Sequence, residues 1–151
     1  MRCQIVSVFR KVVFTAFEIG CLIYFGVVGY WLLYPYEPLI IKRQPIEIVN
    51  PGKSVAAGDL LLYKIEWQKN MNIHGVLSRK IINSYKVDLE EAEATEHIGI
   101  GRSVVPVRIP RWITPGVHYL RWSVSYKVNP IRTVSVSVDS EKFTVVERRA
   151  S

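Results

Sequence analysis

Residues 119–130 read YLRWSVSYKVNP, and this stretch has the clearest strand pattern in the chain. Alternate positions are apolar, and in an extended strand alternate side chains lie on the same face. Asn129-Pro130 ends the pattern, because proline cannot donate a hydrogen bond to a sheet. The stretch therefore predicts a strand whose apolar face lies in a hydrophobic core and comprises Leu120, Trp122, Val124, Tyr126 and Val128.

The same alternation recurs on both sides of this strand, with turn signals at intervals of about ten residues, which is typical of an antiparallel sandwich. We predict an all-β domain with an immunoglobulin-like or fibronectin-like antiparallel β-sandwich fold, in which Trp67 and Trp122 anchor the core. The other expected strands are residues 46–49, 61–68, 76–82, 85–89, 103–109, 134–138 and 143–145.

Residues 88–97 interrupt the alternation with the sequence DLEEAEATEH, which contains acidic residues and no Lys or Arg. Helix-forming residues dominate its middle, and a concentration of like charges is typical of a solvated surface. We expect a short exposed helix or an acidic loop here, and no packed strand.

Residues 12–34 form an almost wholly apolar segment with a single charge at Glu18. A helix needs about 20 such residues to cross a bilayer, so we predict a single transmembrane helix. Basic residues precede it without an acid, which favours a cytoplasmic N-terminus and an extracytoplasmic C-terminal domain. The expected organisation is a basic N-terminus at 1–11, the helix at 12–34, a connector at 35–44, the β-sandwich ectodomain at 45–147 and a tail at 148–151.

Two processing events are alternatives to a retained anchor. Val27 and Gly29 could serve a signal peptidase, although the apolar segment continues through Leu33 and Glu18 interrupts it. Ile19-Gly20-Cys21 resembles the end of a lipoprotein signal, but Glu18 stands where that motif has leucine. The retained helix therefore remains our prediction.

The helix carries two candidate interaction features. Aromatic residues near its outer end suit the headgroup region of a membrane, and they are Tyr30, Trp31, Tyr34 and Tyr36. A stripe at spacings of three and four residues predicts a face for packing against another helix, or for homo-oligomerisation, and comprises Glu18, Leu22, Gly26 and Gly29. The alternative is that Glu18 reaches the inner headgroups and that the glycines are incidental.

No pattern in the sequence indicates catalysis, a cofactor or a metal. His74, His97 and His118 are not spaced as metal ligands, and we expect His118 to be a hydrogen-bonded strand histidine. Residues 99–101, Gly-Ile-Gly, are expected to form a turn. Both cysteines, Cys3 and Cys21, lie before or inside the apolar segment, so the ectodomain has no disulfide. We therefore predict a non-enzymatic protein with no cofactor.

The chain has a formal net charge of +7, and arginine is frequent in its C-terminal part. These arginines could form a face for anionic headgroups or an acidic partner, or they could be ordinary outward-facing strand residues. An exported domain does not normally meet nucleic acid, so we do not expect a nucleic-acid partner. The candidate basic face comprises Arg102, Arg108, Arg111, Arg121 and Arg132.

The connector YPYEP at residues 34–38 and the ending PGVHYLRWSVSYKVNPIRTVSVSVDSEKFTVVE at residues 115–147 resemble small membrane-anchored immunoglobulin-like proteins of tailed bacteriophages. The resemblance implies a bacterial inner-membrane setting and no catalytic residues. The apolar helix, the strand pattern and the lack of catalytic motifs together lead us to expect a non-enzymatic binding or structural module that docks a protein partner at the extracytoplasmic face. The alternatives are a structural component of the phage particle and an accessory subunit that binds a membrane complex through its helix.

Overall fold

The computed structural model describes the backbone of residues 2–94 and 97–147, and the side chains of residues 10–94 and 97–147. The chain divides into two units, one of residues up to Pro35 together with Asn129–Arg132, and one of the remaining residues. The elements are α1 (Arg2–Leu33), β1 (Leu39–Ile41), β2 (Glu47–Ile48), η1 (Pro51–Lys53), β3 (Ser54–Ala56), β4 (Leu60–Lys69), β5 (Gly75–Ile82), β6 (Lys86–Asp88), β7 (Ala92–Ala94), β8 (Gly99–Arg108), β9 (Gly116–Asn129), β10 (Arg132–Asp139) and β11 (Phe143–Val146).

Within the first unit, side chains of the turn at 129–132 donate to carbonyl groups at the end of α1 and to that of the residue after it. Asn129 Nδ2 donates to the carbonyl oxygen of Trp31 at 3.0 Å. Arg132 Nη1 donates to the carbonyl oxygens of Leu32 and Tyr34 at 2.8 and 2.7 Å. The last carbonyl oxygens of a helix receive no hydrogen bond from within the helix, so Asn129 and Arg132 supply donors for them.

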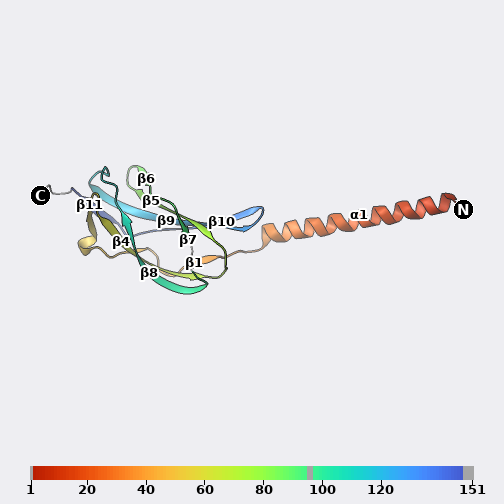
Figure 1. Cartoon of the computed structure of the whole chain (residues 1–151), viewed down its shortest axis with the longest axis horizontal. Helices are drawn as coiled ribbons and strands as arrows, with labels where there is room; N and C mark the ends of the chain where they lie inside the picture. The colour runs from red at the N-terminus through yellow and green to blue at the C-terminus, as the bar shows by residue number, and fades with distance from the viewer. Residues whose placement is uncertain (1, 95–96, 148–151) are drawn as a thin grey trace. The chain divides into compact units, whose positions relative to one another are not determined.

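The second unit consists of two β-sheets (Figure 1). In the four-stranded sheet, β4 pairs with β1 and β2 and, along its whole length, with the edge strand β8. In the seven-stranded sheet the order is β3-β11-β9-β5-β6, with β10 paired to β9 and β7 paired to β5. The predicted β-rich domain after a single N-terminal apolar helix is therefore confirmed.

One hydrophobic core joins the inner faces of both sheets. In β4, Leu61, Tyr63 and Ile65 are buried, and in β9 the predicted apolar face is buried from Leu120 to Tyr126. Because side chains alternate along a strand, the polar residues between them face outward. The predicted orientation of both strands is therefore confirmed.

Two glycines make room in this core for large aromatic rings. Gly75 in β5 lies opposite Tyr126 in β9, and a Cβ atom on Gly75 would lie 2.6 Å from that ring. Gly101 in β8 lies opposite Trp67 in β4, and a Cβ atom there would lie 2.5 Å from the indole. Each ring thus packs over a cross-strand position where no side chain competes for the space.

Two segments expected to lie outside the sheets are strands. Residues 39–41, placed in the connector by the sequence, form β1, which pairs with the end of β4 and buries Leu39 and Ile41. Within the acidic segment, β7 pairs with β5, and Ala94 is buried while Glu93 faces solvent. The expectation of no packed strand there was wrong, because small apolar residues alternate with the acids and only the acids need solvation.

Two further predictions concern residues 99–101, which follow the acidic segment, and His118. Residues 99–101, expected as a turn, begin β8 and pair with the end of β4. His118 is buried in β9, and its Nε2 lies 3.0 Å from the carbonyl oxygen of Thr114, to which it donates. His118 is therefore the hydrogen-bonded strand histidine that its position predicted.

Candidate functional site

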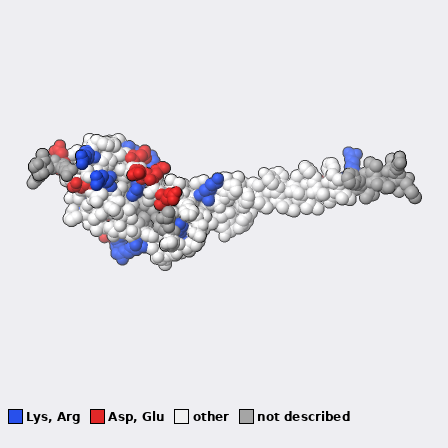
Figure 2. All heavy atoms as spheres, viewed as in Figure 1, with Lys and Arg blue, Asp and Glu red and all other residues white. Residues whose placement is uncertain are grey.

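The surface of residues 12–33 of α1 is almost wholly apolar, with one charge at Glu18. Residues Arg10–Leu33 form a stretch long and apolar enough to cross a membrane, with a mean hydropathy of 2.0, and the stretch is unburied. Large apolar side chains such as Phe17, Leu22, Ile23 and Phe25 are exposed around the helix. Figure 2 shows no charged atoms along most of the visible face of the helix. Such a helix needs an apolar environment, which a bilayer or a partner protein would supply.

The four residues of the predicted packing face lie on one stripe of α1. Their spacings of four, four and three residues bring Glu18, Leu22, Gly26 and Gly29 to the same side at 3.6 residues per turn. Leu22 is 72% exposed, and a Cβ atom on either glycine would meet no atom within 4 Å. The stripe is therefore open to a second helix, and its role as a contact stays a prediction.

We expect Gly29→Leu to abolish helix association if this stripe is the contact, because the added side chain would hold two helices apart. Glu18→Gln should weaken association only several-fold, since polar contacts in membranes contribute about 0.6–2 kcal/mol. A two-hybrid assay that reports on transmembrane helices measures both changes.

Gly20→Leu is the matched control for this experiment. Gly20 lies on the opposite side of the helix from the stripe, and its Cβ position is equally open. Equal association for Gly29→Leu and Gly20→Leu would show that the stripe does not mediate the contact.

The predicted aromatic residues are divided between the two units. In the first unit, Tyr34 donates its backbone N–H to the carbonyl of Tyr30 at 2.9 Å, and the two rings lie 5.1 Å apart. Trp31 lies in the last turn of α1, whereas Tyr36 belongs to the second unit. Tyr30 and Trp31 lie in the last turn of α1 and Tyr34 follows it, and their place at a membrane interface stays a prediction.

The arginines of the predicted basic face are distributed over both sheets. Arg102 and Arg108 lie on the outer face of β8, and Arg102 pairs with Glu66 at 3.3 Å. Arg111 lies in the turn before β9, against Gly58. Arg121 lies on the outer face of the other sheet, and Arg132 belongs to the first unit. Because the outer faces of two packed sheets point in opposite directions, Arg102 and Arg121 do not share one surface.

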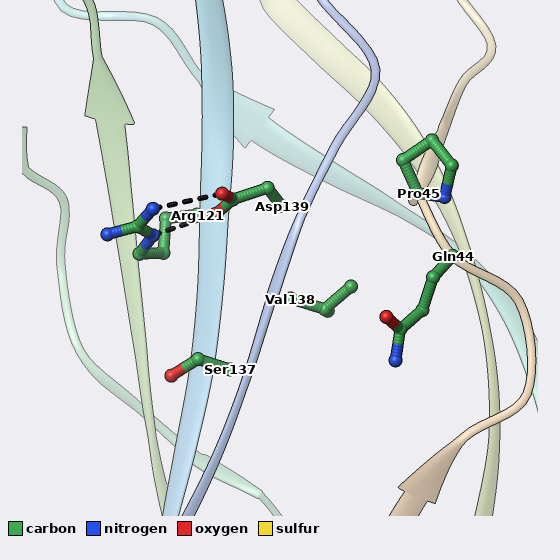
Figure 3. Close-up of a pocket in the computed structure, with 6 residues that line it drawn as sticks. All are labelled: Gln44, Pro45, Arg121, Ser137, Val138 and Asp139. Atoms are coloured by element: carbon green, nitrogen blue, oxygen red, sulfur yellow. Dashed lines mark hydrogen bonds and ion pairs between the residues drawn. The ribbon is translucent and has the colours of Figure 1, made fainter.

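Arg121 is part of an open hollow of about 580 Å³ beside β10 (Figure 3). Its Nε and Nη2 donate to the two carboxylate oxygens of Asp139 at 2.7 and 2.9 Å, and this pairing raises the pKa of Arg121. Figure 3 shows Gln44 and Pro45 across the hollow from this pair. Asp139 neutralises Arg121, so the hollow presents no uncompensated cation to a ligand.

A second cavity, of about 270 Å³, lies between the two sheets. Its wall is mostly apolar and includes the aromatic side chains of Tyr63, Trp67 and Trp122. Arg79 and Ser103 are the polar side chains that line it together with the hydroxyl-bearing Tyr63. An apolar cavity with a few polar groups is the usual form of a small-molecule site.

Arg79 occupies an inward-facing position of β5, between Leu77 and Ile81 on the same face of the strand. It pairs in register with Trp122, and its Nη2 donates to the carbonyl oxygen of Glu90 at 3.3 Å. Its Nε is buried and has no acceptor among the residues that the structure describes. The sequence did not single out Arg79, although its position two residues from both Leu77 and Ile81 places it on the apolar face of the strand.

Within residues 10–94 and 97–147, no group of three or more His, Cys, Asp or Glu side chains could hold a metal ion. Acidic side chains gather on the visible face near β6 and β7 (Figure 2). Asp88, at the end of β6, pairs with Lys80 of β5 at 2.8 Å, which lowers the pKa of the Asp88 carboxyl. This acid is thus neutralised by the neighbouring strand.

No protein-family model and no curated protein matches the chain. Among solved structures, the C-terminal domain of wzt is similar with a TM-score of 0.46 and 9% identity, and 78% of each chain is covered. A β-glucosidase from Listeria innocua is similar with a TM-score of 0.38 and 11% identity, over 70% of this chain and 16% of the glucosidase. Similarity at these TM-scores and identities does not indicate what this chain binds or does.

Proposed function

We propose that this protein is a single-pass, membrane-anchored binding module without enzymatic activity, whose immunoglobulin-like β-sandwich docks a protein partner on the extracytoplasmic face. The observation that carries the proposal is the unburied apolar helix α1, joined to a β-rich unit with its own hydrophobic core. A helix whose surface is almost wholly apolar favours an anchor, and a separate core favours a unit that works outside the bilayer.

Two features support the finer parts of this proposal. Two mostly antiparallel sheets with alternating strands fit an immunoglobulin-like or fibronectin-like sandwich. Arg10 and Lys11 at the start of the apolar stretch fit an N-terminus in the cytoplasm of a bacterial cell, with the β-sandwich beyond the inner membrane.

The open stripe from Glu18 to Gly29 favours a second candidate, an accessory subunit that joins a membrane complex through α1. In that case the β-sandwich would be secondary to the helix contact. The Gly29→Leu experiment separates the candidates, because docking by the sandwich alone survives this substitution.

We expect the full-length protein to remain in the membrane pellet after a carbonate wash, because about 20 apolar helical residues are enough to hold a chain in a bilayer. Mass spectrometry of the pelleted protein should find peptides from residues before Tyr30. A soluble mature form that begins near Tyr30 would show instead that the segment is a cleaved signal.

The location of the protein separates a membrane module from a particle component. Fractions of expressing or infected cells should be compared with purified phage particles by quantitative mass spectrometry. Enrichment in the inner membrane is the expected result, whereas stoichiometric recovery in particles would support a structural component of a virion.

A further inference from the structure

We propose that the cavity between the two sheets binds a small organic carboxylate with a planar apolar body, and that Arg79 pairs with its carboxylate. This site lies wholly within the second unit and is independent of any protein partner docked by the sandwich. Its wall comes from both sheets, with Trp67 from β4 and Trp122 and Arg79 from the β9–β5 pair.

The size and lining of the cavity are the first observation behind this proposal. The cavity has a volume of about 270 Å³ and lies beside Tyr63, Trp67 and Trp122, so the side chains around it leave room for a small molecule. Flat aromatic walls fit a planar apolar body, which would contact them by stacking or by edge-to-face packing.

The charge of Arg79 is the second observation. A guanidinium has five N–H donors, and among the described residues only the carbonyl oxygen of Glu90 accepts from it. The buried Nε has no described acceptor, and none of the described carboxylates forms an ion pair with Arg79. Arg79 is partly buried, and its buried Nε still lacks an acceptor among the described residues, so an anionic group in the cavity would supply one.

The two observations together select the ligand chemistry. An arginine fork matches the two oxygens of a carboxylate, and the apolar wall would exclude a small, strongly hydrated anion that has no body to bury. The ligand therefore combines a carboxylate with an apolar ring system. Ser103, which lines the same cavity, supplies a hydroxyl for a second polar contact.

The proposal is tested with 2-naphthoate as the probe and 2-naphthalenemethanol as its neutral counterpart. The full-length protein in lipid nanodiscs is titrated with each compound at pH 7 by calorimetry, and empty nanodiscs correct for partition into lipid. We expect the carboxylate to bind at least about tenfold more tightly than the alcohol, because a charge-assisted contact with Arg79 contributes more than a neutral one.

Three substitutions locate the binding. Arg79→Met should remove the preference for the carboxylate, and Ala92→Leu should abolish binding of both compounds by filling the cavity, which Ala92 lines. Arg108→Met is the matched control, because Arg108 is exposed on the outer face of β8 and should leave binding unchanged. Thermal unfolding of each variant without probe checks the fold, and we expect no loss of stability for Arg79→Met, since an unpaired inward charge is removed.

The outcomes decide the proposal in either direction. A preference for the carboxylate that is lost in Arg79→Met and kept in Arg108→Met supports it. Equal binding of the two compounds, equal binding by both arginine variants, or no binding of 2-naphthoate at millimolar concentration overturns it. A lowered midpoint of thermal unfolding for Arg79→Met, together with unchanged binding of 2-naphthoate, would also overturn it and would assign Arg79 a role in the stability of the sandwich.

Discussion

Trp122→Ala should lower the free energy of unfolding of the β-rich unit by about 3–5 kcal/mol, which is the usual cost of removing a large buried ring. Trp122 is only 4% exposed, and its indole lies on the inner face of the central strand β9. Typical domains are stable by about 5–15 kcal/mol, so this single change removes a large share of the total. Chemical unfolding of the full-length protein in nanodiscs, followed by circular dichroism in the far ultraviolet, measures the difference.

Trp112→Ala is the matched control, because Trp112 is 68% exposed in the turn that precedes β9. We expect this change to stay within about 0.5 kcal/mol of the parent protein, as most surface substitutions do. If the two tryptophan variants were equally stable, the assignment of the inner face of β9 would be wrong.

Gly75→Ala should destabilise the same unit by about 1–3 kcal/mol, although it adds a single methyl group. That methyl would lie 2.6 Å from the ring of Tyr126 and 2.7 Å from Val124, and both residues are fully buried. Alanine also restricts the unfolded chain, which favours folding by about 0.4–1 kcal/mol, but the overlap outweighs this gain. The same unfolding experiment measures the net effect.

Val76→Ala, at the neighbouring position of β5, serves as the comparison for Gly75→Ala. Val76 is exposed on the outer face of the strand, so its truncation leaves no cavity and should change stability far less. A neutral or stabilising Gly75→Ala would mean that the Tyr126 ring can move away at little cost.

Local patterns in the sequence were sufficient for the elements that depend on their own periodicity. The long apolar segment is found in α1, and the alternation around Tyr63 and Trp122 is found in β4 and β9, with the predicted faces buried. Such elements can be predicted from sequence because buried residues recur with a period of about 3.6 in a helix and 2 in a strand.

Short strands could not be read in this way, because their formation depends on a partner strand. Residues 39–41 become β1 by pairing with the end of β4, and β7 forms within an acidic segment because β5 offers an unpaired edge. Three residues carry too little periodicity to outweigh the composition around them, and the hydrogen bonds that stabilise them come from elsewhere in the chain.

The sequence by itself thus determined an apolar helix long enough to cross a membrane, a β-rich unit after it and the inward faces of the long strands. Only the tertiary structure decided that Arg102 and Arg121 lie on different sheets, that Asp139 neutralises Arg121, and that Arg79 lies at a cavity beside Trp67 and Trp122. The physical reason is that burial follows from the period of one strand, whereas charge pairing and cavities depend on distances between residues far apart in the chain.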